Sequence, residues 1–185
     1  MNYLNKTKIF FLAITAIAFT SCDNDDAPVN EEELITTVIV NLTSGGQTVT
    51  FTSRDLDGDG PNAPIITVSG DLTANTSYMG SVSFLNETET PAENITTEIV
   101  DEGVDHQLFF QAPSALGTFT YNDTDANGRP IGIQFTLLTG NATSGNLLVT
   151  LRHEPIKTAA GVVAGDITNA GGSTDAAVTY PVTVN

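Results

Sequence analysis

Apolar and polar residues alternate along most of this chain, with breaks at Gly, Asn, Asp and Pro. In residues 77–86, for example, Tyr78, Val82 and Phe84 lie on one side of an extended chain and three serines lie on the other. A period of two residues is typical of strands that bury one face. We therefore predict an all-β sandwich or barrel of about nine strands. The predicted strands are 34–42, 47–53, 65–70, 77–86, 106–112, 117–122, 132–138, 146–153 and 176–184.

One segment has a different pattern. Thr90 is a candidate N-cap, followed by Pro91 at the first helical position and Glu93 at the third, which together make a capping box. Gly103 can end such a helix. The sequence therefore predicts one short helix at about 91–102, inserted between strands. Its apolar face would carry Ala92, Ile95 and Ile99.

The stretch LTANTSY, residues 72–78, resembles a pattern of fibronectin type III domains, with Leu72, Thr76 and Tyr78 in the matching places. In those domains the tyrosine hydroxyl bonds back to the backbone as a tyrosine corner. The alternative is that Tyr78 is simply an aromatic residue of the core. With the strand pattern, the resemblance predicts an immunoglobulin- or fibronectin-III-like β-sandwich.

The first 21 residues have the pattern of an export signal. Lys6 and Lys8 precede an apolar run at 9–19, which is shorter than the roughly 20 residues that a membrane-spanning helix needs. Cys22 follows, and the junction resembles the lipobox of bacterial lipoproteins, although Phe19 stands where Leu, Val or Ile is usual. We predict that 1–21 is a lipoprotein signal peptide and that Cys22 carries the lipid. The alternative is an ordinary secretory signal with a chance cysteine.

Residues 22–33 after the signal are rich in acids and lack aromatic residues, which is typical of a flexible tether. Acidic runs directly after the lipidated cysteine resemble the surface-export signals of Bacteroidota lipoproteins. This predicts an outer-membrane lipoprotein exposed at the cell surface, the periplasmic face being the alternative. Residues 34–185 then form a single domain.

The charge of the chain excludes one large class of partners. It has 22 Asp and Glu residues against six Lys and Arg, a net charge of −16. Nucleic-acid binding requires clustered Lys and Arg, so no nucleic acid is expected as a partner. Strong acidity instead favours solubility and attracts cations.

Two loops, DLDGDG at 55–60 and DTDANG at 123–128, place oxygen-bearing side chains at alternate positions before a glycine. Hard cations such as Ca²⁺ prefer this kind of oxygen cluster. Neither loop has the glutamate that an EF-hand requires at its twelfth position. The alternative is that both are ordinary β-turns. The candidate Ca²⁺ ligands are Asp55, Asp57, Asp59, Asp123, Asp125 and Asn127.

In each of two predicted strands a histidine ends the apolar, core-facing stripe: His106 in one and His153 in the other. Each has a carboxylate beside it in sequence, Asp105 and Glu154 respectively. If the strand ends meet, two imidazoles and a carboxylate could bind Zn²⁺ or another transition metal. The alternative is a pair of hydrogen-bonded histidines at the edge of the core.

No enzyme signature is present: the chain has no G-x-S-x-G, HExxH, phosphate-binding or dinucleotide-binding motif. It also has no Trp to make a stacking platform for sugars. A carboxylate pair for glycoside hydrolysis is the one enzymatic reading left open by the many acids. We predict that the protein is not an enzyme.

Five blocks together resemble a family of small surface lipoproteins of marine flavobacteria and their relatives, which accompany TonB-dependent outer-membrane receptors. The resemblance implies a non-enzymatic ligand- or metal-binding accessory module for outer-membrane uptake, with such a receptor as partner. The periplasmic-binding-fold label of some members does not suit this chain, which lacks repeated strand–helix alternation. The alternative function is a structural or adhesion sandwich with Ca²⁺-stabilised loops. The blocks are 54–64, 72–87, 91–110, 121–132 and 151–155.

Overall fold

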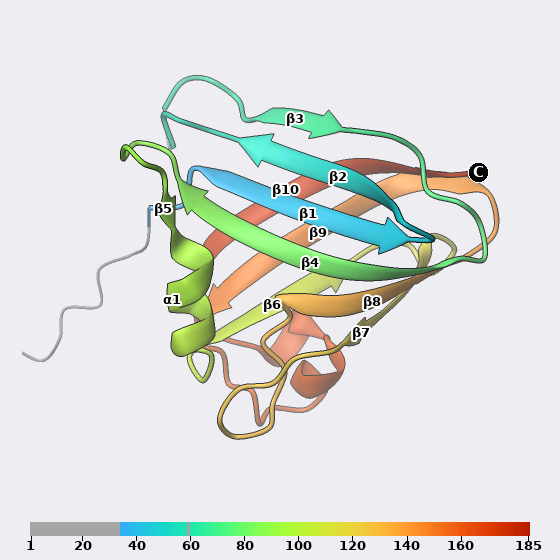
Figure 1. The fold of residues 1–185 in the computed structure, drawn as a ribbon. Coiled ribbons are helices and arrows are strands. Elements are labelled where there is room, and N and C mark those ends of the chain that lie inside the picture. Colours follow the sequence, from blue (N-terminus) through green and yellow to red (C-terminus); the bar gives the residue numbers. More distant parts are fainter. Residues whose placement is uncertain (1–33, 59) are drawn as a thin grey trace, which may run out of the picture. The chain divides into compact units, whose positions relative to one another are not determined.

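Two antiparallel sheets face one another in the computed structural model, which describes residues 34–58 and 60–185 (Figure 1). The larger sheet has the strand order β3-β2-β1-β4-β8-β7, with β5 beside β4, and the smaller has the order β10-β9-β6. The all-β sandwich is thereby confirmed. The strands of the larger sheet are β1 (Thr37–Ser44), β2 (Gln47–Arg54), β3 (Ile65–Val68), β4 (Ser77–Asn86), β5 (Glu93–Asn94), β7 (Gly117–Tyr121) and β8 (Gln134–Thr139). Those of the smaller sheet are β6 (His106–Gln111), β9 (Thr143–His153) and β10 (Ser173–Val184).

All nine predicted strands are present, because the period of two residues that predicts them also decides which side chains are buried. In β1, for example, Val38, Val40 and Leu42 are buried, whereas the residues between them are more exposed. The last hairpin is longer than predicted: β9 begins at Thr143 and β10 at Ser173.

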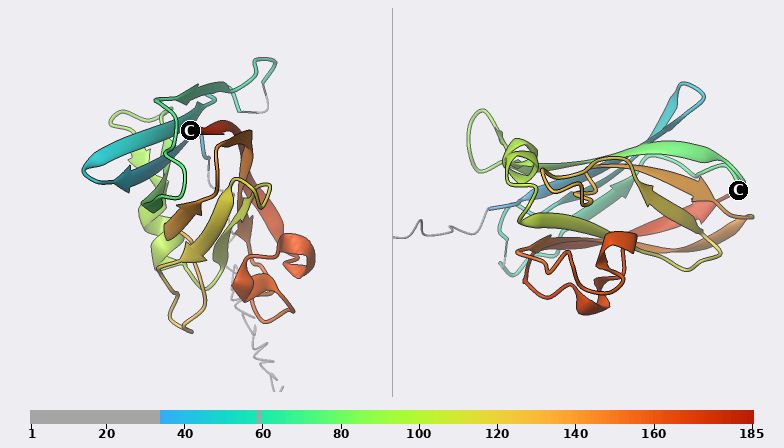
Figure 2. Two further views of the ribbon diagram at one scale, coloured as in Figure 1. Left: turned by 90° about the vertical axis from the view of Figure 1, so that its right-hand side faces the viewer. Right: turned by 90° about the horizontal axis from the view of Figure 1, so that it is seen from below.

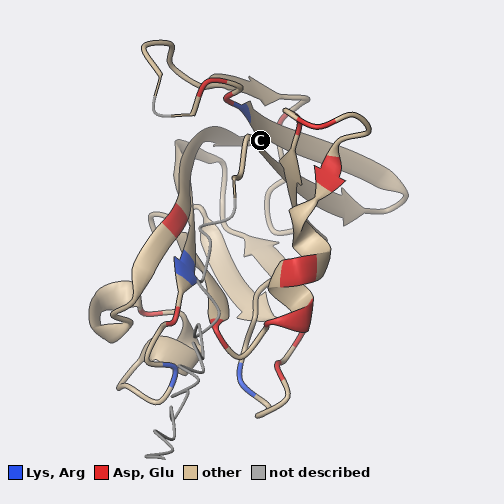
Figure 3. Ribbon diagram, turned by 90° about the vertical axis from the view of Figure 1, so that its left-hand side faces the viewer, with Lys and Arg blue, Asp and Glu red and all other residues tan. Residues whose placement is uncertain are grey.

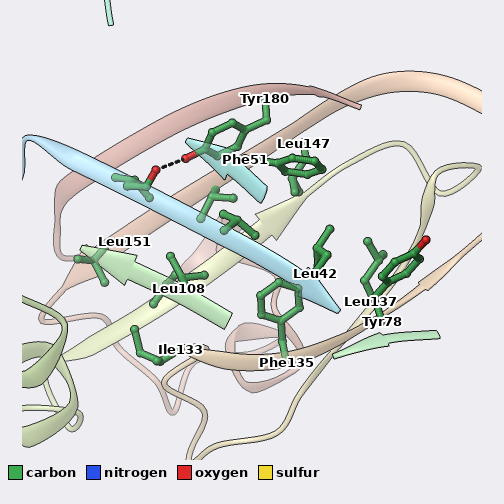
Figure 4. Close-up of a cluster of buried hydrophobic side chains, with 14 of the residues drawn as sticks. Leu42, Phe51, Tyr78, Leu108, Ile133, Phe135, Leu137, Leu147, Leu151 and Tyr180 are labelled. Carbon is green, nitrogen blue, oxygen red and sulfur yellow. Dashed lines mark hydrogen bonds between the residues drawn. The ribbon is translucent and has the colours of Figure 1, made fainter. Parts of the chain in front are cut away.

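Two tyrosine hydroxyls join the sheets through the core. Tyr180 in β10 donates to the carbonyl oxygen of Val38 in β1 at 2.9 Å (Figure 4). Tyr121 in β7 donates to the carbonyl oxygen of Leu108 in β6 at 2.6 Å. Burial raises the pKa of both tyrosines, that of Tyr121 to about 12, so both hydroxyls remain protonated donors at neutral pH.

The tyrosine corner is present. The hydroxyl of Tyr78, at the start of β4, accepts a hydrogen bond from the backbone N–H of Thr73 at 2.8 Å. The predicted tie-back to the backbone is thus confirmed, and it fixes the entry of the chain into β4. The further assignment to the immunoglobulin or fibronectin III class stays a prediction.

The predicted helix boundaries at 91–102 are wrong at the start. The helix α1 spans Ile95–Asp101, and its N-cap is Asn94 rather than Thr90. Residues Glu93–Asn94 instead pair with the end of β4 as β5, so backbone pairing there competes with the capping box. The apolar face is partly as predicted, since Ile95 and Ile99 are buried and pack in the core.

The segment 154–172, which we call the cap segment, covers the outer face of the smaller sheet (Figure 2). It contains two short 3-10 helices, Val162–Ala164 and Ile167–Asn169. Val162 and Ala170 pack on Phe109 of β6 in a second, small cluster. The amide nitrogen of Gln107 also donates to the carbonyl oxygen of Val162 at 2.8 Å.

The predicted signal peptide 1–21, Cys22 and the tether 22–33 lie outside the described residues. The described residues, 34–58 and 60–185, belong to one compact unit. Among the described residues, no helix has both the length and the apolar character that crossing a membrane requires.

Candidate metal centre

The structure brings His106 and His153 together at one end of the sandwich. They are directly opposite one another in the pairing of β6 with β9. Their ring centroids are 4.7 Å apart and the rings meet edge to face at 79°. Each lies two residues along its strand from a fully buried leucine, Leu108 or Leu151, and on the same face, so the pair continues the core stripe toward the surface.

Asp175 supplies the carboxylate of this group. Its Oδ2 atom lies 3.8 Å from Nε2 of His106 and 3.7 Å from Nδ1 of His153. Asp175 is the additional residue of a β-bulge, because Thr174 pairs with Arg152 and Ala176 pairs with Leu151. A bulge redirects a side chain from the face that strict alternation would give it. We call His106, His153 and Asp175 the His–Asp cluster.

Asp105 and Glu154, the carboxylates predicted from sequence, are not members of the His–Asp cluster. Both side chains are exposed. Each is the chain neighbour of a histidine in or beside a strand, and neighbouring residues of a strand point to opposite faces. Their backbones do hold the strand ends together, since the N–H of Glu154 donates to the carbonyl oxygen of Asp105 at 2.6 Å.

The backbone fixes the tautomer of His106. Its Nδ1 lies 3.2 Å from the carbonyl oxygen of Glu102. A carbonyl oxygen only accepts, so Nδ1 carries the proton and the lone pair is on Nε2, which faces Asp175. Burial lowers the pKa of His106, against the opposing effect of the Glu102 carbonyl. His106 is therefore neutral at pH 7, and a neutral imidazole is the form that binds metals.

The dimensions of the cluster are close to those of a metal site. The three donor atoms all lie within 4.8 Å of one another. Tetrahedral zinc, with bonds of about 2.0–2.2 Å to nitrogen and oxygen, places neighbouring donors about 3.4 Å apart. The two histidine–aspartate separations, 3.7 and 3.8 Å, exceed that spacing by only a few tenths of an ångström. Small side-chain rotations toward a shared ion would therefore complete the geometry.

In the first acidic loop, one carboxylate is bonded within the loop and another has an oxygen that a bound cation could satisfy. Asp57 accepts from the amide nitrogen of Asn62 at 2.7 Å, and this bond is the main reason that the pKa of Asp57 is lowered. Asp55 has a buried oxygen, Oδ1, with no hydrogen-bond partner in the described part of the chain. Asp59 lies outside the described residues.

The second acidic loop holds a lysine instead. Both oxygens of Asp123 accept from backbone N–H groups, those of Gly132 and Gln134. Asp125 is buried and its Oδ2 lies 2.9 Å from the ammonium of Lys157.

The ammonium of Lys157 also donates to the carbonyl oxygens of Gly103 and Pro130. This is the environment that the Ca²⁺ hypothesis assigned to a metal ion, and Lys157 provides the positive charge. The two carboxylates of the predicted Ca²⁺ site at Asp123, Asp125 and Asn127 are thus engaged with protein donors, and the side chain of Asn127 is exposed. The Ca²⁺ site at this loop stays a prediction.

Two residues of these sites, Asp175 and Lys157, were not identified from the sequence. Asp175 stands just before the predicted start of the last strand, and Gly171 and Gly172 in front of it are the signal for a turn that delivers it. Lys157 is the only lysine of residues 34–185, which is a hint to a specific role in so acidic a chain.

The charges of the described residues favour cations over anions. Acidic residues are spread over the surface, including α1, and Lys and Arg are few (Figure 3). A negative surface raises the local concentration of cations and speeds their encounter with a site.

Comparison with models of protein families, with curated proteins and with solved structures gives no match to this chain. The resemblance to flavobacterial surface lipoproteins stays a prediction, and the chemistry of the site has to be argued from its own residues.

Proposed function

We propose that this protein is a non-enzymatic metal-binding module of the cell envelope, anchored through Cys22 and accessory to uptake across the outer membrane. The observation that carries the proposal is the His–Asp cluster: two imidazoles and one carboxylate from three strands, with donor atoms within 4.8 Å of one another. The receptor partner and the location at the outer membrane come from the sequence resemblance.

The donor set favours a divalent transition metal. Imidazole suits Zn²⁺, Cu²⁺ and Fe²⁺, whereas Ca²⁺ and Mg²⁺ prefer ligand sets made of oxygen. Three protein ligands leave at least one coordination position for water or for a ligand that travels with the metal. An open position of this kind suits a protein that must also release its metal.

The three side chains of the His–Asp cluster are largely buried. His106 is completely buried, and the side chains of His153 and Asp175 are 12% and 6% exposed. The three donor groups therefore lie largely away from solvent at the end of the core. We therefore assign the open position to exchange of the ion.

The test is metal binding by residues 34–185 with Zn²⁺ as the probe, measured by calorimetry and by elemental analysis after desalting. We expect one Zn²⁺ per chain, with loss of binding in His106→Ala, His153→Ala and Asp175→Asn. Asp105→Asn and Glu154→Gln are matched controls that remove a nearby negative charge and should keep the ion. Equal loss in the controls, or no bound Zn²⁺ in the wild type, would overturn the proposal.

A second candidate function is a structural or adhesion sandwich in which Ca²⁺ stiffens the first acidic loop. It is favoured by the buried Oδ1 of Asp55, because a buried carboxylate oxygen without a partner is costly. If it holds, Ca²⁺ raises the melting temperature of the wild type and not that of Asp55→Asn. Zn²⁺ retention and Ca²⁺ stabilisation are separate readouts, so each hypothesis can fail alone.

A further inference from the structure

The side chain of Arg152 is hydrogen-bonded to the turn at residues 171–174, which leads into Asp175. Its guanidinium makes four hydrogen bonds, to the carbonyl oxygens of Gly171 and Gly172 and to the hydroxyl of Thr174. The bond from Nη2 to Gly172 measures 2.8 Å and the bond from Nε to Gly171 measures 3.0 Å. A planar guanidinium with several donors in fixed directions holds such a set of acceptors in one arrangement, which a lysine ammonium does not.

These hydrogen bonds of Arg152 lie on the opposite face of the smaller sheet from the His–Asp cluster. Arg152 precedes His153 in β9, so its side chain points away from the core. Thr174 pairs with Arg152, and the bulge then places Asp175 on the side of the two histidines. Holding Thr174 outward therefore also fixes where the bulge begins, and with it the direction of the Asp175 side chain.

The turn at residues 171–174 packs too closely on the backbone of His153 to accept a side chain at Gly172. Gly172 has a positive φ of 68°, and a Cβ atom there would lie 2.0 Å from the carbonyl oxygen of His153. The chain thus passes directly over the backbone of one histidine before it delivers the carboxylate. A shift of this turn changes the distance from Asp175 to both imidazoles.

We propose that Arg152 is a positioning residue for the metal centre: by clamping residues 171–174 it sets the β-bulge that holds Asp175 against His106 and His153. The proposal rests on the proposed function. Residues that orient a metal ligand from outside the coordination sphere typically change metal affinity by about 10–100-fold when they are altered.

Charge and position predict opposite results when Arg152 is replaced. Removing a positive charge near a cation site strengthens cation binding through the electrostatic field. Loss of positioning weakens it, because Asp175 is no longer held at the correct distance. The sign of the change in affinity therefore separates the two effects.

The experiment measures the Zn²⁺ dissociation constant of Arg152→Gln, Arg152→Lys and the control Arg129→Gln, which removes an equal charge from the loop at 122–132. The absorption spectrum of each Co²⁺ complex reports the ligand geometry. We expect about 10–100-fold weaker Zn²⁺ binding and an altered Co²⁺ spectrum for Arg152→Gln. We expect a smaller loss for Arg152→Lys and no loss for Arg129→Gln.

The outcomes are distinct. Unchanged or tighter Zn²⁺ binding by Arg152→Gln, with the wild-type Co²⁺ spectrum, would overturn the positioning role while leaving the metal centre intact. Absence of Zn²⁺ binding by the wild type would instead remove the proposed function on which the inference stands. Circular dichroism of each metal-free variant checks its fold, and Arg152→Lys keeps the test open if Arg152→Gln does not fold.

Discussion

Replacement of Lys157 by Met is expected to be one of the most damaging single changes outside the apolar core. The Lys157 ammonium lies 2.9 Å from both Asp125 Oδ2 and the carbonyl oxygen of Pro130, and it also bonds the carbonyl oxygen of Gly103. Methionine retains most of the aliphatic stem, so the loss is electrostatic. Removing one partner of a buried ion pair costs about 3–5 kcal/mol, because the other charge stays buried without compensation.

For a domain of this size, a loss of about 3–5 kcal/mol lowers the melting temperature by roughly 6–20 °C. Thermal and urea unfolding followed by circular dichroism measure it, and Arg129→Gln is the control for loss of a positive charge from the same region. The double variant Lys157→Met with Asp125→Asn should recover part of the loss, because no buried charge remains unpaired. Asn still offers an oxygen to the backbone N–H groups of Asn127 and Arg129, which bond to Asp125 Oδ1.

The same pair gives a pH dependence with a defined sign. Burial acts to raise the pKa of Asp125, but the hydrogen bonds from Arg129 and Lys157 outweigh it and the pKa is lowered from its ordinary 3.8. Its contribution to stability is therefore present above about pH 3.8 and is lost as the pH falls through the lower, folded-state pKa. Either of two results would refute the argument for a buried ion pair. One is a loss of less than about 1 kcal/mol in the free energy of unfolding of Lys157→Met, and the other is no recovery in the double variant.

Three further predictions follow from other contacts. Tyr180→Phe leaves the carbonyl oxygen of Val38 without its cross-sheet donor, so urea unfolding should show a loss of about 1–3 kcal/mol. Gly172→Ala places a Cβ atom 2.0 Å from the carbonyl oxygen of His153, and we expect a lower melting temperature together with weaker Zn²⁺ binding; an unchanged affinity would contradict the tight passage. Because the pKa of His106 is lowered from 6.5, protons should compete for this ligand only below that pH, and calorimetry with Zn²⁺ from about pH 5 to 8 measures the onset.

The strands were predictable because their information is local. Alternation in β4 (Ser77–Asn86) gives both its limits and its buried face, with no knowledge of its neighbours. The stripes place His106 and His153 at strand ends, but that these ends meet is given by the pairing of β6 with β9 and not by the sequence. The tyrosine corner at Tyr78 is also local, since the bond spans only five residues.

The features that the sequence did not reveal depend on segments far apart in the chain. The backbone at Glu93 pairs with β4, which a capping-box pattern at Thr90 does not reveal. Lys157 enters the second acidic loop from 32 residues away and supplies its cation. Asp175 joins the histidines because a bulge shifts the register of β10 on β9, and a one-residue shift reverses the face that every preceding side chain would take.

The cap segment begins directly after His153 and ends shortly before Asp175, so an ion shared by these two residues would act as a staple across its base. Closing a loop of about 20 residues restricts the unfolded chain by roughly 2–3 kcal/mol, which the ion would supply as a cross-link. Local opening of the cap would then require release of the ion. Exchange of its amide protons should slow as Zn²⁺ rises, in proportion to the occupancy of the site. The exposed side chains of Ile156 and Val163 lie on this segment. The outer surface of the cap segment would therefore be more rigid with the ion bound than without it.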